Sequence, residues 1–312
     1  MKRVTDRPIA KRLTAKSLLA RIRRILVPTD FSQPSFAAIP YARAASQHFG
    51  AEVHLLHVVD STQYASKSLT LPLVSPAELN RPLLKRLKAV ASKYEAGGKI
   101  HVMNPREGRA YKEICAAARE RNAGLIVIAT HGHTGLKHAL LGSTAERVVQ
   151  HSPCPVLVVR QQAGEADERS ARLRRILVPI DFSSCSQLAF DCGVALARDF
   201  GAELRLVHVI DPHSYPFGDQ YAALDATRLM QSARDTAQRE MREMAGEAKV
   251  QFSIQDRKGS PAKEICSAAN KDVDLIVTST HGRTGLGHVL IGSVAEHVIR
   301  NAPCPVLVLS CR

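Results

Sequence analysis

The sequence predicts an α/β protein built from two repeated domains, each an open five-stranded parallel sheet with helices on both faces. Short apolar, β-branched segments alternate with longer amphipathic segments, as expected for strands joined by crossover helices. The whole pattern recurs after about 150 residues, a period that indicates a duplicated domain rather than a solenoid.

Four pairs of segments carry the repeat. They are 24–32 and 175–183, 56–60 and 207–211, 112–115 and 263–266, and 153–158 and 303–308. These pairs divide the chain into a basic N-terminal extension (1–22), a first domain (23–160), a linker (161–173) and a second domain (174–312).

The elements of the first domain follow from local signals. Ser32 is a helix N-cap candidate and Gly50 a C-terminal stop, which predicts a helix to about residue 48. Further helices are expected up to about 96, from about 109 to 121, and from 143. The strands expected are 24–30, 52–59, 99–103, 124–130 and 155–160 in the first domain, and 174–181, 203–210, 249–255, 273–280 and 305–310 in the second.

Candidate binding residues stand where three of these strands end. Ligands of open parallel sheets bind at the carboxyl ends of the strands, near the point where strand order reverses. Asp30 closes the first strand, His57 and Val58 close the second, and 129–132 closes the fourth. The second copy has the equivalent residues Asp181, His208 and Val209, and 279–282. A carboxylate there suits ribose hydroxyls, although Asp30 and Asp181 could instead cap the turn that follows.

A Gly-Ser pair opens the helix after the fourth strand in both copies, at Gly142-Ser143 and Gly292-Ser293. The first turn of a helix presents unpaired N–H groups and a partly positive dipole end, which favour a phosphate. Glycine would let the backbone approach the ligand closely. The same Gly-Ser pair is also compatible with an ordinary N-cap.

At these residues the sequence resembles the universal stress protein family in its tandem two-domain form. The family's nucleotide-binding members carry Gly-x-x-Gly, nine residues, then Gly-Ser/Thr. Gly132 and Gly282 match its second glycine, whereas Ala129 and Ser279 replace its first. The resemblance implies a Rossmann-like, adenine nucleotide α-hydrolase-like fold that binds ATP, with or without Mg²⁺.

The resemblance also assigns cofactor-binding residues, with Asp30 and Asp181 for ribose, Val58 and Val209 for adenine, and the glycine loops for phosphates. In the first domain the predicted set is Pro28, Thr29, Asp30, Val58, Ala129, His131, Gly132, Gly135, Gly142, Ser143 and Thr144. In the second it is Pro179, Ile180, Asp181, Val209, Ser279, His281, Gly282, Gly285, Gly292, Ser293 and Val294.

The leading hypothesis is a stress-response regulatory protein that binds ATP without rapid turnover. No Walker lysine follows either glycine loop, no Gly-x-Ser-x-Gly elbow is present, and no catalytic residue or metal ligand is assigned. Two alternatives stay open: a nucleotide-free dimerising interaction module, and a slow ATPase that would use His133, Lys137 or Arg283.

The net charge of +14 is concentrated near the N-terminus, where residues 1–24 hold nine Lys/Arg and one Asp. Such a segment is expected to be a solvated, poorly ordered extension, and only weakly suggests nucleic-acid binding. No membrane span or signal peptide is expected. Seven cysteines without metal-ligand spacing argue against disulfides and zinc, and favour a reducing, cytoplasmic location.

The last strand of each domain predicts how the copies associate. Residues 156–159 and 306–309 are apolar, and an exposed apolar edge strand invites aggregation. We therefore expect the two strands to pair about a pseudo-two-fold axis within the chain; a homodimer of whole chains is a further expectation.

Overall fold

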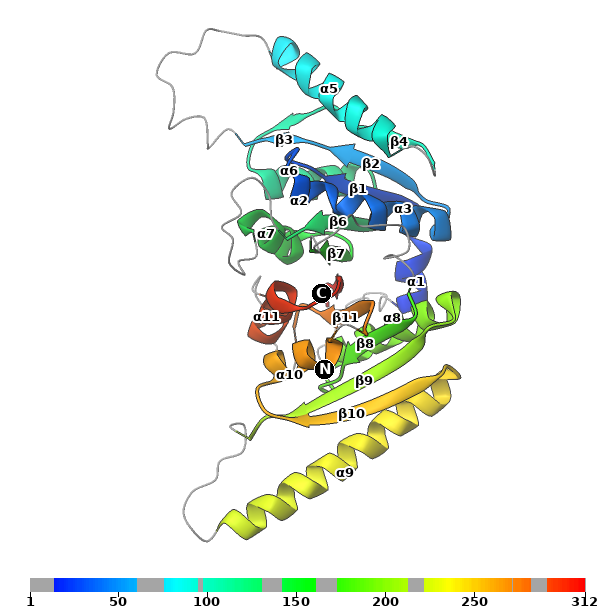
Figure 1. The fold of residues 1–312 in the computed structure, drawn as a ribbon, viewed down its shortest axis with the longest axis vertical. Coiled ribbons are helices and arrows are strands. Elements are labelled where there is room, and N and C mark those ends of the chain that lie inside the picture. Colours follow the sequence, from blue (N-terminus) through cyan, green and yellow to red (C-terminus); the bar gives the residue numbers. More distant parts are fainter. Residues whose placement is uncertain are drawn as a thin grey trace, which may run out of the picture.

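One ten-stranded sheet runs through the whole protein (Figure 1), in the order β10-β9-β8-β11-β12-β7-β6-β1-β2-β4. The computed structural model describes residues 14–60, 76–94, 98–130, 142–160, 173–212, 222–270, 272–281 and 291–311. Each half of the sheet contains five parallel strands. The predicted fold of two repeated parallel-sheet domains is therefore confirmed.

The strands repeat between the halves. The first half contributes β1 (Arg24–Pro28), β2 (Glu52–Leu56), β4 (Ile100–Val102), β6 (Leu125–Ala129) and β7 (Val156–Val159). The second contributes β8 (Arg175–Pro179), β9 (Glu203–Ile210), β10 (Phe252–Lys258), β11 (Leu275–Ser279) and β12 (Val306–Leu309). In the first half, β3 (Val58–Val59) and β5 (Arg106–Glu107) form a separate two-stranded sheet.

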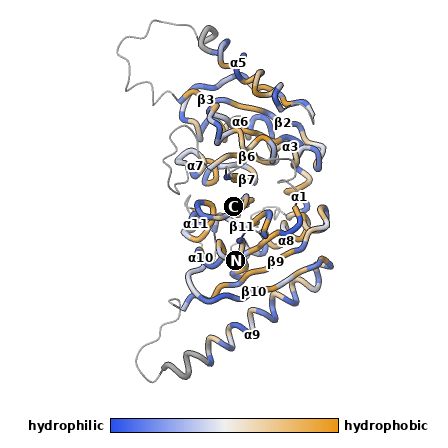
Figure 2. Tube along the Cα trace, viewed as in Figure 1, coloured by the Kyte–Doolittle hydropathy of each residue, from blue (hydrophilic) through white to orange (hydrophobic). Residues whose placement is uncertain are grey.

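Helices cover both faces of the sheet, and two hydrophobic clusters lie beneath them. One face carries α1 (Ala15–Ala20), α2 (Gln33–Phe36), α3 (Ala38–Phe49), α5 (Pro76–Lys93), α8 (Ser184–Phe200) and α9 (Ala222–Ala248). The other carries α6 (Ala110–Glu120), α7 (Ser143–His151), α10 (Pro261–Ala269) and α11 (Ser293–Asn301). Figure 2 shows the apolar residues gathered along the central strands, as expected for a sheet buried on both faces.

The two halves join through their last strands. β7 and β12 pair antiparallel, with Leu157 opposite Leu307 and Val158 opposite Val306. Arg300 on α11 adds an ion pair to Glu146 on α7 at 3.3 Å, and the two helices lie next to each other (Figure 1). The predicted pairing within the chain is confirmed, and neither apolar strand is left as an edge.

Three element boundaries differ from the predictions. The helix after Ser32 is divided at Ala37 into α2 and α3, although Gly50 does end α3 in the left-handed conformation. The strand expected at 249–255 is β10, at 252–258, because Lys249 adopts a positive φ that prolongs the turn after α9. Residues 52–59 form two strands in the first half but the single strand β9 in the second.

The end of the basic extension is folded, contrary to the expectation of a solvated tail. Thr14 caps α1, accepting a hydrogen bond from the Ser17 amide at 3.3 Å. Leu18, Leu19 and Ile22 are buried, and α1 packs against α8 of the second half. The basic residues predicted a solvated tail, but these apolar positions lie on one side of a short helix and are buried.

The expectation of no disulfide is wrong. Cys185 in the first turn of α8 and Cys311 after β12 form a disulfide across 126 residues, with both residues half-buried. Of the five free cysteines described, Cys266 is half-buried and the other four are buried. Within the part of the chain that the structure describes, no helix is long and apolar enough to span a membrane.

Candidate functional site

Asp30 and Asp181 each begin a tight turn at the carboxyl end of the first strand of their half. Asp30 Oδ1 accepts hydrogen bonds from the Ser32 amide at 3.0 Å and the Ser32 hydroxyl at 2.5 Å. Asp181 makes the same bonds with Ser183, at 3.0 and 2.6 Å. The turn-capping alternative is therefore observed. It does not exclude a ribose hydroxyl, because a carboxylate has about four acceptor positions.

The residue after each aspartate has an unusual backbone. Phe31 and Phe182 have φ values of 64° and 62°, a region that bulky residues rarely adopt. Such strain in folded proteins tends to cluster at functional sites. The phenylalanine rings contact His57 and His208, with centroid distances of 4.4 and 5.1 Å. This feature could not be predicted from the sequence, because a phenylalanine carries no signal for positive φ.

His57 and His208 link the second strand to the end of the first. The Nδ1 atom of His57 lies 2.8 Å from the Thr29 carbonyl oxygen, and that of His208 lies 2.7 Å from the Ile180 carbonyl oxygen. These contacts repeat in both copies and hold the first strand end beside the residues predicted to meet adenine.

The backbone groups of Val58 face the space beyond the first strand. The Leu56 carbonyl accepts from Thr29, whereas the His57 and Val59 carbonyls accept from Arg106 and Gly108 on the opposite side. Since backbone groups alternate in direction along a strand, Val58 points the same way as Leu56, past the end of β1. Val209 has the corresponding position, two residues after Val207, whose carbonyl accepts from Ile180.

The glycines of the two Gly-Ser pairs hold the helix starts against the fourth strand. The Gly142 amide donates to the Thr130 carbonyl at 2.7 Å, and the Gly292 amide donates to the Thr280 carbonyl at 2.8 Å. A Cβ on Gly142 would lie 2.9 Å from the Thr130 oxygen, and one on Gly292 would lie 3.4 Å from the Thr280 oxygen. Close approach of the backbone therefore favours glycine at position 142, whereas position 292 has room for a Cβ at ordinary contact distance.

These glycines, rather than the serines, are the N-caps of α7 and α11. Among the described residues, neither helix start receives a side-chain capping hydrogen bond. Ser143 and Ser293 occupy the first helical position and are exposed. The N-cap alternative is therefore observed, with the glycine as the cap. The first-turn amides lie at the carboxyl edge of the sheet, where a phosphate could meet them.

The replaced glycine positions lie at the ends of β6 and β11. Ala129 and Ser279 are both buried and neither has a positive φ, so a side chain causes no backbone strain there. The Ser279 hydroxyl donates to the His281 carbonyl at 2.8 Å, and Thr280 Oγ1 lies 2.9 Å from His281 Nδ1. The serine thus ties down the start of its own loop.

The structure brings most of the predicted residues to one edge of each half-sheet. Because β1 lies between β2 and β6, the Asp30 turn, Val58 and the Gly142 helix start are neighbours; β8 arranges the second copy in the same way. His131, Gly132, Gly135, Gly282 and Gly285, and the ATPase candidates His133, Lys137 and Arg283, lie outside the described residues. No cluster of three or more metal-binding side chains occurs in the described ranges.

The chain matches the family model described as "Universal stress protein family" twice, at residues 21–160 and 172–310. A universal stress protein of Mycolicibacterium smegmatis is 28% identical over 92% of this chain and 97% of its own length. One from Methanocaldococcus jannaschii is 40% identical over 46% of this chain and 85% of its own. The crystal structure of a universal stress protein from Archaeoglobus fulgidus has a TM-score of 0.67 at 27% identity, covering 94% of this chain and 98% of that one.

Proposed function

Since the chain belongs to the universal stress protein family, we propose that it is a stress-response regulatory protein that binds ATP at the carboxyl edge of one or both half-sheets. It acts through the bound state rather than through rapid turnover. Partner proteins would then respond to the ATP-bound form. The proposed location is the cytoplasm.

The repeated helix start carries this proposal. In both copies a glycine N-cap is bonded to the backbone at the end of the fourth strand, and no side chain among the described residues caps the helix. The amides of the first turn, together with the partly positive helix end, suit an anion. Retention of the same backbone arrangement in two copies with different side chains supports a shared ligand.

The remaining contacts suit the other parts of an adenine nucleotide. A carboxylate from Asp30 or Asp181 would accept hydrogen bonds from ribose hydroxyls, and the outward backbone groups of Val58 or Val209 would meet the adenine edge. The hydroxyls of Ser143, Thr144 and Ser293 would donate to phosphate oxygens. Mg²⁺ would arrive with the nucleotide, because Mg²⁺ commonly binds substrate phosphates and keeps several of its waters.

The test is to purify the full chain without added nucleotide, denature it, and quantify the released adenine nucleotides per chain. Chromatography with mass spectrometry separates ATP from ADP. We expect up to one ATP for each copy, and binding of added MgATP wherever a site was empty. Gel filtration of the native protein before denaturation removes free nucleotide, so only bound nucleotide is counted.

The outcomes separate the alternatives. Release of ADP, with conversion of added ATP, would favour a slow ATPase. No nucleotide in the purified protein, and no binding of MgATP at millimolar concentration, would contradict the proposal and favour a nucleotide-free interaction module.

A further inference from the structure

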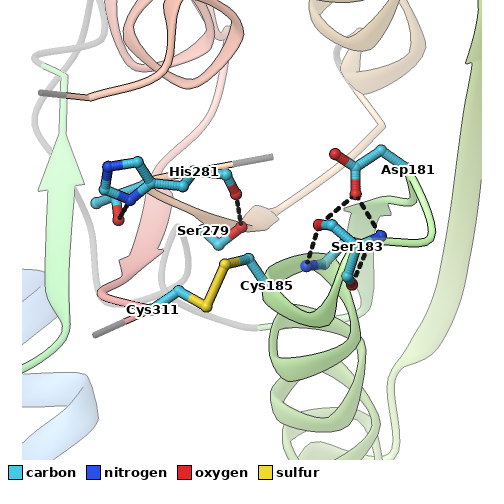
Figure 3. The surroundings of a disulfide bond; sticks show 8 residues. Asp181, Ser183, Cys185, Ser279, His281 and Cys311 are labelled. Atoms are coloured by element: carbon cyan, nitrogen blue, oxygen red, sulfur yellow. Dashed lines mark hydrogen bonds between the residues drawn. A yellow bond between two sulfur atoms is a disulfide. The ribbon is translucent and has the colours of Figure 1, made fainter. Parts of the chain in front are cut away.

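The Cys185–Cys311 disulfide joins the two sides of the second site. Cys185 lies on the turn that Asp181 begins: the Asp181 carboxylate accepts from Ser183, and Ser183 Oγ accepts from the Ser186 amide at 3.1 Å. The cross-link therefore attaches directly to the hydrogen-bonded turn that orients Asp181, the residue proposed to bind ribose (Figure 3).

The other half of the cross-link is attached to the glycine-loop side. The Thr280 amide donates to the Leu309 carbonyl at 2.9 Å, and the Thr280 carbonyl accepts from Gly292. Cys311 follows Leu309 by two residues, and Figure 3 shows the disulfide below Ser279, with Ser183 on the far side of Cys185. The disulfide thus links the Asp181 turn to the end of β11, where the Thr280 carbonyl binds the start of α11.

Only the second copy has this cross-link. The repeat places Pro34 opposite Cys185 and Gln161 opposite Cys311. Any effect of the disulfide on nucleotide binding should therefore be confined to the second site, and the first site is a control within the same chain.

We propose that Cys185 and Cys311 form a reversible redox cross-link that sets the nucleotide affinity of the second site. This inference rests on the proposed function. The oxidised form holds the Asp181 turn and the Thr280 strand end in the binding arrangement; reduction releases the residues after β12 and loosens that arrangement. We expect ATP to bind the second site about tenfold more weakly after reduction, within the usual range of coupling between sites.

The chemistry is thiol–disulfide exchange with a small-molecule disulfide. The Cys185 thiolate attacks that disulfide, forms a mixed disulfide and releases one small thiol; the Cys311 thiolate then displaces the second. Two electrons pass to the small disulfide and two protons leave the protein thiols. Cys185 lies half-buried in the first turn of a 17-residue helix, so we assign it as the attacking thiol.

The other five cysteines make poor competitors for this exchange, and Cys115 is buried. Burial raises the pKa of the Cys154, Cys192 and Cys304 thiols to about 12, so they hold little thiolate at neutral pH. Burial also raises the pKa of the Cys266 thiol. Cys185 and Cys311 are both half-buried and therefore within reach of solvent.

The experiment uses the full chain oxidised with glutathione disulfide or reduced with dithiothreitol. Peptide mass spectrometry establishes whether Cys185 and Cys311 are linked, and equilibrium dialysis measures ATP binding at each site. The Gly142→Ala background weakens the first site, because the new Cβ would lie 2.9 Å from the Thr130 oxygen, so binding at the second site can be followed there. Cys185→Ser and Cys311→Ser should each bind ATP like the reduced protein, whatever the redox conditions, with the first site unchanged.

A second readout follows from linkage. If ATP binds the oxidised form tenfold more tightly, saturating ATP should make the midpoint potential of the pair more negative by about 30 mV. This shift measures the coupling in the unmodified chain, independently of any folding defect in a variant.

The outcomes distinguish the two proposals. The redox inference would be overturned if the second site bound ATP with the same affinity in the oxidised and the reduced protein. Failure of glutathione disulfide to link Cys185 to Cys311 would also overturn it. Either result would leave the proposed function standing. Absence of ATP binding in both states would overturn the proposed function and the redox inference together. A redox effect of equal size at the first site would also contradict the inference.

Discussion

The two candidate sites share a backbone and differ in the side chains that secure it. The Asp-Ser turn, the histidine contact to the first strand and the glycine helix start recur with hydrogen-bond lengths that differ by about 0.1 Å or less. What recurs is therefore the arrangement of main-chain donors and one carboxylate, which is what recognition of phosphate and ribose needs.

The first site is secured by hydroxyls and ring contacts. Thr29 Oγ1 lies 2.8 Å from Ser35 Oγ and accepts from the Phe31 amide at 3.0 Å, where the second copy has Ile180. The Arg86 guanidinium lies 4.3 Å from the centre of the Phe31 ring. Among the described residues, no cation lies over Phe182.

The second site is secured by a covalent bond and a loop hydrogen bond. It has the Cys185–Cys311 disulfide and the Ser279 bond to His281, and it has exposed Val294 where the first copy has Thr144. The difference teaches that a duplicated candidate site can keep its backbone arrangement while different side-chain interactions stabilise each copy. Among the described residues, only the second copy has a disulfide.

The largest effect should come from breaking the sheet that carries both sites. Val308 is 2% exposed on β12, opposite Val156, and Val308→Asp would bury an unpaired carboxylate. We expect the free energy of unfolding to fall by roughly 3–5 kcal/mol, measured from the urea midpoint.

Val294→Asp makes the same chemical change at an exposed residue of the same half and should cost less than about 0.5 kcal/mol. If both variants were equally stable, Val308 would not be buried in the core of the sheet. If Val308→Asp lost ATP binding at the second site and kept it at the first, the two halves would unfold separately.

The next largest effect should come from the paired glycine changes. In Gly142→Ala the new Cβ would meet the Thr130 oxygen at 2.9 Å and force the helix start to move, whereas in Gly292→Ala the contact is 3.4 Å. We expect the first site to lose ATP affinity roughly tenfold or more, and the second site to lose less. Isothermal titration of the two variants measures both affinities. A greater loss in Gly292→Ala would contradict the geometry.

The sequence was sufficient for those parts of each site that depend on local pattern. Apolar runs and crossover spacing predicted the strands, and Gly50 and the Gly-Ser pairs marked real helix boundaries. The Phe31 backbone and the Cys185–Cys311 bond were missed for a physical reason. Each is imposed by tertiary packing: the disulfide spans 126 residues, and no local spacing reveals which cysteines become neighbours.

A smaller effect should come from exchanging the residues that replace the family's first glycine. Ser279→Ala removes the hydroxyl that donates to the His281 carbonyl, and a lost hydrogen bond of this kind costs about 1 kcal/mol. We expect ATP affinity at the second site to fall about fivefold, by isothermal titration.

The reciprocal change, Ala129→Ser, adds the hydroxyl to the first site and is the matched control. It should leave ATP affinity within about twofold of the parent or raise it slightly. A loss at the first site as large as that in Ser279→Ala would show that the serine acts through its size and not through its hydrogen bond.

The smallest effect concerns pH and the opposite edge of the sheet. His54 lies 3.2 Å from Glu52 and stacks on His101, with a centroid distance of 5.2 Å; the second half has Glu203 and Arg205, also 3.2 Å apart. Burial lowers the pKa of His54 from its usual 6.5. The hydrogen bond to Glu52 raises this pKa and the charge of His101 lowers it, but burial is the largest effect.

His54 is therefore protonated at a lower pH in the folded protein than in the unfolded chain. Between the folded-state and unfolded-state pKa values, the unfolded chain binds more protons. The contribution of His54 to stability is full above about pH 6.5 and is lost as the pH falls through the folded-state pKa. Between pH 7.5 and 5.5, the urea midpoint should fall more in the parent protein than in His54→Gln. Arg205→Gln serves as the control in the second half: arginine stays charged throughout this range, so this variant should keep the parent's pH dependence. If His54→Gln showed the same fall as the parent, the two halves would not differ in their response to acid at this edge.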